Sequence, residues 1–131
     1  MIGLLIVTHC DLGKEFLNAA EFIVGKMDAV KVVSITHASD SEEILKTLQE
    51  KIAALNTGDG VIILTDMFGG TPSNVSLSFL QDKDIEVLTG VNLPMVIAIA
   101  QNRTNFGLKD LAEKAQEAGK MSISLAGKLL E

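Results

Sequence analysis

The stretch Leu4-Leu5-Ile6-Val7-Thr8-His9-Cys10-Asp11 decides the fold that we expect for this chain. Four consecutive aliphatic residues predict a strand that is buried on both faces, as in the middle of a parallel sheet. The strand runs directly into a histidine, a cysteine and an aspartate. Because open α/β sheets bind their ligands at the carboxyl ends of the strands, His9 becomes a candidate functional residue.

A second segment repeats this pattern. Asp66-Met67-Phe68-Gly69-Gly70-Thr71-Pro72-Ser73-Asn74 follows another apolar strand, which we expect over residues 61–65. Pro72 suits the first position of a helix, with Thr71 before it as the N-cap. If the two strands are neighbours, their axes lie about 4.8 Å apart. His9 and Asp66 can then come within hydrogen-bonding distance of each other.

The rest of the chain predicts one α/β domain over residues 1–131, doubly wound around a mostly parallel sheet with helices on both faces. Strands are expected at 30–35 and 85–89, and helices at 12–24, from Ser39 or Asp40 to Leu55, at 92–100 and at 108–118. We expect a strand order that starts 2-1-3-4. The strictly alternating segment Met121–Leu125 predicts an antiparallel edge strand at the C-terminus.

Composition excludes several classes of function. The chain has 131 residues, a formal net charge of −6 and a single cysteine. The negative charge argues against nucleic acid as a partner, and one cysteine excludes an internal disulfide or a multi-cysteine metal site. The apolar run after Met1 is too short to cross a bilayer and lacks a basic leader. We therefore expect a cytoplasmic protein with no metal, no cofactor and no membrane insertion.

The two segments together predict a phosphoryl acceptor. A carboxylate at Asp66 that accepts from Nδ1–H of His9 would leave the Nε2 lone pair free as a nucleophile. Gly69 and Gly70 can present backbone amides to an anion, and Thr71 begins a helix whose N-terminus attracts phosphate. No Walker or GxGxxG motif is present. The phosphoryl group must therefore come from another protein or a small donor.

The Thr-His strand end, the Asp-x-x-Gly-Gly-Thr-Pro-x-Asn segment and Gly90-Val91-Asn92-Leu93-Pro94-Met95 resemble the enzyme IIA domain of the mannose family. This family belongs to the phosphoenolpyruvate-dependent sugar phosphotransferase system (PTS). The resemblance implies that His9 is phosphorylated on Nε2, oriented by Asp66, and that Gly69, Gly70 and Thr71 hold the phosphoryl oxygens. It implies HPr as the donor, a histidine of an EIIB component as the acceptor, and a homodimer that exchanges the last strand.

Two features depart from the family pattern. The family commonly has glycine after the histidine, whereas Cys10 stands here. A IIB domain often follows, whereas we expect a stand-alone IIA domain with a separate acceptor. For the remaining candidates, Met67 and Phe68 are either core residues or part of a docking patch, and His37 is expected to be an exposed loop histidine. We expect no catalytic role for Cys10.

Four other functions were weighed. A receiver-like regulator would be phosphorylated on Asp66, but the acidic cluster and lysine of such a site are missing. A cysteine phosphatase needs an arginine where Phe16 stands. The closest rival is the phosphotransfer subunit of a dihydroxyacetone kinase, which uses a similar histidine domain, and by resemblance the Gly-Gly-Thr-Pro segment favours the sugar system over it. A regulatory phosphate sink without a permease is a further alternative, because the sequence does not show which sugar, if any, is transported.

Overall fold

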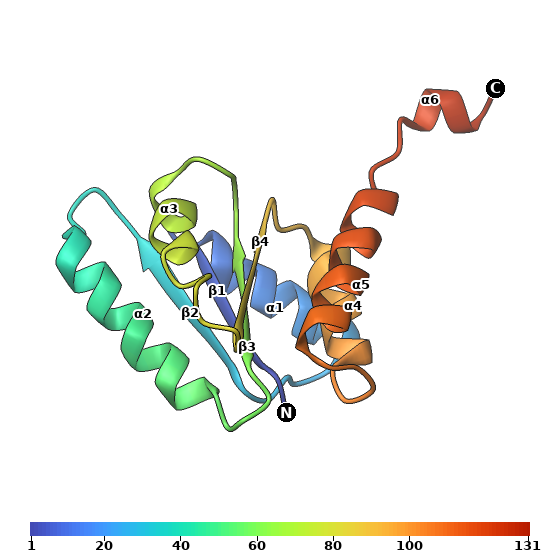
Figure 1. Cartoon of the computed structure of the whole chain (residues 1–131). Helices are drawn as coiled ribbons and strands as arrows, with labels where there is room; N and C mark the ends of the chain where they lie inside the picture. Colours follow the sequence, from blue (N-terminus) through green and yellow to red (C-terminus); the bar gives the residue numbers. More distant parts are fainter.

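The computed structural model describes all residues, 1–131, and shows a parallel sheet between two layers of helices (Figure 1). The elements in chain order are β1 (Gly3–His9), α1 (Leu12–Val24), β2 (Val30–Ile35), α2 (Ser41–Leu55), β3 (Val61–Thr65), α3 (Thr71–Leu77), β4 (Ile85–Thr89), α4 (Leu93–Asn102), α5 (Leu108–Met121) and α6 (Ala126–Leu129). No helix has both the length and the apolar composition needed to cross a bilayer.

The four strands lie in the order β2-β1-β3-β4, and all are parallel, as the sequence predicts. In this register His9 at the end of β1 lies opposite Ile35 of β2, and Val7 lies opposite Thr65 of β3. The residue after Thr65 is Asp66. The strand order therefore places the carboxyl ends of β1 and β3 side by side.

The alternating side chains of the central strands divide the interior into two cores. Leu4, Ile6 and Leu64 point to the face covered by α1, α4 and α5. Leu5 and Ile63 point to the opposite face, under α2 and α3. Every residue of β3, and every residue of β1 except His9, is buried. Because both faces of β1 are buried, the strand holds His9, its one exposed residue, in a fixed position.

The four predicted parallel strands agree with the structure, whereas details of three helices differ from the expectation. Helix α3 begins at Thr71 with Gly70 as its N-cap, one residue earlier than expected. Ile23 has the helical spacing of the apolar residues of α1 but is 56% exposed. Helix α5 does not end at residue 118 but continues to Met121, and Gly119 lies inside it at a place where a Cβ would come within 2.9 Å of Met95.

The C-terminal tail does not form the edge strand predicted from its alternation. After α5 the chain leaves the body of the molecule and ends in the short helix α6 (Figure 1). The sheet keeps four strands, and the apolar residues of this tail are exposed: Met121, Ile123, Leu125, Leu129 and Leu130. An alternating segment forms a strand only by pairing with a sheet edge, and the tail does not fold back onto the open edge of β4.

Candidate functional site

The end of β1 holds the His9 imidazole against Asp66. Nδ1 of His9 lies 2.8 Å from Oδ2 of Asp66, and the backbone N–H of His9 donates to the same oxygen at 2.9 Å. The other carboxylate oxygen accepts from the backbone N–H of Met67 at 3.1 Å. The carboxylate is therefore fixed from three sides. A carboxylate in this position favours the tautomer with the proton on Nδ1, and Nε2 keeps its lone pair.

The pKa of Asp66 is lowered from its usual value of 3.8. Burial alone would raise it, but the hydrogen bonds from the backbone and the ring of His9, together with the charge of that ring, outweigh the burial. Asp66 thus stays ionised at neutral pH. It remains a hydrogen-bond acceptor for His9 over the whole physiological range.

The glycine pair after β3 allows the chain to pass close to the ring. A Cβ on Gly70 would lie 2.8 Å from Cε1 and 3.3 Å from Nε2 of His9, so only glycine fits without moving the imidazole. Gly69 has a φ of +90°, a left-handed conformation, and open space around it. The two glycines are thus required for different reasons, Gly70 for space and Gly69 for backbone conformation.

The backbone at Cys10 has a conformation that glycine adopts more easily than cysteine does. Its φ is +49°, in the left-handed region that a side chain with a Cβ disfavours. Its backbone N–H donates to the carbonyl of Ile35 at 2.8 Å, which ties the turn to β2. Beyond it, the buried Thr8 hydroxyl accepts from the N–H of Gly13 at 2.7 Å and fixes the start of α1. Asp11 does not cap this helix with its side chain, which accepts from Ser34 instead.

A cavity of 220 Å³ opens beside the imidazole. Its walls are six residues from the ends of β1 and β2 and the start of α3: His9, Cys10, Ile35, Thr36, His37 and Thr71. The structure therefore brings Thr71 to the same space as His9. It also brings His37 there, which was expected to be an exposed loop histidine without a role because no motif contains it; His37 is exposed, and it lines the cavity. The signal available was its position just after β2, at the same edge of the sheet.

Met67 and Phe68 project from the loop after β3. They are 54% and 72% exposed, so they are not core residues. They extend from the loop that also carries Gly69 and Gly70. Two large apolar side chains next to an exposed imidazole form a surface that another protein can cover. The structure thus excludes the core role, and the docking patch stays a prediction.

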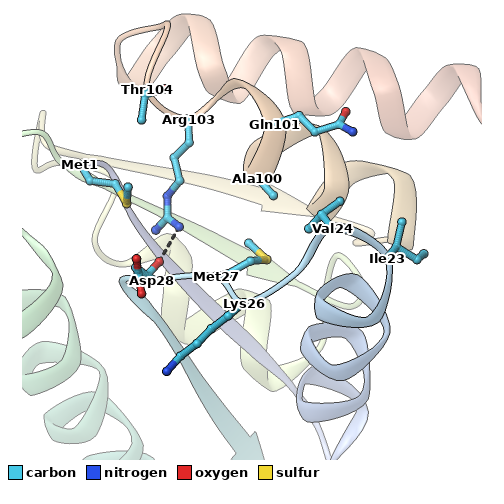
Figure 2. Close-up of a pocket in the computed structure, with 10 residues that line it drawn as sticks. All are labelled: Met1, Ile23, Val24, Lys26, Met27, Asp28, Ala100, Gln101, Arg103 and Thr104. Atoms are coloured by element: carbon cyan, nitrogen blue, oxygen red, sulfur yellow. Dashed lines mark hydrogen bonds between the residues drawn. The ribbon is translucent and has the colours of Figure 1, made fainter.

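A larger cavity lies at the opposite end of the sheet, where the strands begin, and its residues have a structural role. It measures 540 Å³ and lies where α1 and α4 end, next to the loop that leads into β2 (Figure 2). Its polar centre is Arg103, which is 5% exposed and donates to the carbonyls of Ile2, Asp28 and Ala29. Burial lowers the pKa of Arg103, and the charge of Asp28 acts in the opposite direction. The only arginine of the chain therefore serves the fold, far from His9.

Comparison with known proteins identifies the family. The family described as EIIA-man, PTS system fructose IIA component, matches residues 3–116. The chain belongs to this family of phosphotransferase-system IIA components. It is 31% identical over 128 residues to the sorbose-specific EIIA component of Lacticaseibacillus casei, an alignment that covers 92% of this chain and 90% of the relative.

Two further proteins resemble the chain over nearly its full length. It is 28% identical to the mannose-specific EIIAB component of Escherichia coli (strain K12), over 93% of this chain but only 38% of that protein. A crystal structure of phosphotransferase system component EIIA from Streptococcus agalactiae superposes with a TM-score of 0.89 at 29% identity, covering 98% of this chain and 99% of the other. The resemblance to the mannose family that the sequence motifs indicate is thereby confirmed.

Proposed function

We propose that this chain is a phosphoryl carrier of a phosphoenolpyruvate-dependent sugar phosphotransferase system. It would accept a phosphoryl group from phospho-HPr on His9 and pass it to a histidine of an EIIB component. One observation carries this proposal: His9 is exposed, its Nδ1 is held by Asp66, and its Nε2 lies beside Gly70 at an open cavity. A cytoplasmic location goes with these partners.

The transfer step needs no proton to leave the site. The Nε2 lone pair of His9 attacks phosphorus as the N–P bond of the donor breaks, and that electron pair returns to the donor nitrogen. The imidazole becomes positively charged while Nδ1–H stays hydrogen-bonded to Asp66, which stabilises the charge. In this proposal the amides of the Gly69–Gly70 loop and the hydroxyl of Thr71, which lines the cavity, would hold the transferred oxygens. Helix α3 has only seven residues, so these local groups matter more than its dipole.

Association into a homodimer forms part of the same proposal. β4 pairs only with β3, so its other edge is open, and a groove of 240 Å³ runs beside it towards Ile123. The exposed alternating tail of a second copy could add to this edge as a strand and bury its apolar side chains. The resemblance to the family supports this exchange, and it would explain why the tail is apolar although it packs on nothing in one chain.

Reconstitution tests the proposed transfer. The chain is mixed with radiolabelled phosphoenolpyruvate, enzyme I and HPr, and the adduct is examined for its stability in acid and base. We expect an acid-labile, base-stable adduct that is absent from His9→Ala. Asp66→Asn should fold normally but react about 10- to 100-fold more slowly, because an amide favours the wrong tautomer. Label retained in His9→Ala, or a base-labile acyl phosphate, would contradict the proposal.

A further inference from the structure

We propose that His37 is a second imidazole of this site, and that its protonated form contacts the phosphoryl group carried on His9. This inference rests on the proposed phosphoryl transfer and extends it. Both histidines of the chain line the same 220 Å³ cavity, although they are far apart in the sequence and the whole of α1 lies between them. The fold thus places the imidazole of His37 beside the same space as the ring of His9.

The fold holds His37 at the rim of the cavity through a short, hydrogen-bonded turn. Ile35, which precedes the turn, lies opposite His9 in the sheet and accepts a hydrogen bond from Cys10. The backbone N–H of Thr36 donates to Oγ of Ser39 at 3.0 Å, and the N–H of Ser39 donates to the carbonyl of Thr36 at 3.1 Å. Because these two bonds close the turn around His37, its backbone is fixed relative to the end of β1.

The charges around the cavity show why the position of His37 matters for binding a phosphoryl group. A phosphoryl group brings nearly two negative charges, and no lysine or arginine lines the cavity. The only arginine is committed to three carbonyls at the far edge of the sheet. The titratable groups on the elements that border the cavity are Asp66 beside His9, Cys10 in the wall, Asp11, Lys14 and Glu15 around the start of α1, and Asp40, Glu42 and Glu43 around the start of α2. Lys14 is the one cation among them, and it does not line the cavity.

His37 is therefore the side chain that can pair with the phosphoryl oxygens as a cation. A protonated imidazole near the oxygens would stabilise the phosphorylated form relative to the free protein. Since His37 is exposed, the effect should be modest, about three- to tenfold in the equilibrium for transfer from phospho-HPr. It should also be larger at pH about 6 than at pH about 8, because only the protonated imidazole is a cation.

The test compares the equilibrium constant for transfer from phospho-HPr in the wild type, His37→Gln and His37→Arg at both pH values. The donor is the same throughout, so its own titration cancels in the ratios. We expect His37→Gln to lose about three- to tenfold at pH about 6 and little at pH about 8. His37→Arg should keep the high value at both. Lys46→Gln, which removes a positive charge from the exposed face of α2, should match the wild type.

Three results would overturn the inference. The first is an equilibrium constant for His37→Gln equal to that of the wild type at both pH values. The second is a loss in His37→Arg as large as that in His37→Gln, which would show that shape rather than charge matters. The third is an equal loss in Lys46→Gln, which would indicate a general charge effect. A wild type that takes up no phosphoryl group would instead overturn the proposed function itself.

Discussion

Gly70 is the residue on which the position of the His9 ring depends most directly. In Gly70→Ala the new Cβ would lie 2.8 Å from Cε1, so the ring must move away from its present place. We expect phosphoryl transfer to fall by at least about tenfold, because a misplacement of about 1 Å costs up to about 100-fold in rate. Rapid-quench measurement of transfer from phospho-HPr checks this.

Gly69→Ala is the matched control for that substitution. Its φ of +90° is unfavourable for alanine, but the added Cβ meets nothing within 4 Å. The variant should lose about 1–2 kcal/mol of stability in urea unfolding, while the folded fraction transfers at a rate near that of the wild type. Equal rates for the two alanine variants would show that the space at Gly70 is not what places the ring.

Cys10 carries strain that can be removed. Its φ of +49° suits glycine, so Cys10→Gly should stabilise the protein by up to about 1 kcal/mol, the relief of the left-handed conformation less the greater entropy of an unfolded glycine. Cys10→Ala keeps the Cβ and should show no such gain. Urea unfolding of the two variants measures the difference. A gain of the same size in Cys10→Ala would mean that the thiol, not the backbone, is unfavourable.

Asp66 should make stability depend on acid pH. Its pKa is lower in the folded protein than its ordinary value of 3.8, so the ionised carboxylate stabilises the fold fully above that value, and this contribution is lost as the pH falls through the lower folded pKa. The stability difference between the wild type and Asp66→Asn should therefore shrink between about pH 5 and about pH 2. Urea unfolding at several pH values tests this, and a difference independent of pH would contradict it.

At the scale of elements, Arg103 joins three segments. It follows α4 and donates to carbonyls at the start of β1 and in the loop before β2 (Figure 2). In Arg103→Lys a single ammonium cannot replace the three N–H donors of the guanidinium, so buried carbonyls lose their hydrogen-bond donors. We expect the free energy of unfolding to fall by about 2–4 kcal/mol. The exposed neighbour Gln101 offers the control, since Gln101→Ala should change stability by less than about 0.5 kcal/mol. A small effect of Arg103→Lys would show that water replaces the missing bonds.

The four parallel strands were predictable from the sequence, including β2 and β4, which are only partly buried. The residues of β1, β2, β3 and β4 follow from apolar runs between turns, and the parallel order follows from helices between them. The role of Arg103 was not predictable from the sequence. Its guanidinium donates to carbonyls about 75 or more residues away, and no local sequence pattern indicates such bonds. His9 and Asp66 were found because each ends an apolar strand. His37 was expected only as an exposed loop residue, because a position after β2 does not show that the side chain lines a cavity together with His9.

At the scale of the whole molecule, the exposed tail predicts association. Ile123→Asp together with Leu125→Asp should weaken the proposed dimer, because aspartate cannot be buried against a second copy without a large cost. The free energy of unfolding of the single chain should stay unchanged, since both side chains are exposed. Phe22→Asp, at a position 91% exposed on α1, should leave association unaltered. Sedimentation equilibrium measures the mass, and a wild type that stays at 14.0 kDa would contradict the exchange.

The bond between His9 and Asp66 spans 57 positions of the chain. It exists only when β1 and β3 have paired, a non-local step that comes late and slowly in folding compared with helix formation. A newly made or partly unfolded chain therefore contains the histidine but not its oriented tautomer. Such a chain would draw little phosphoryl group from the donor, so phosphate would not be trapped on molecules that are unable to pass it on.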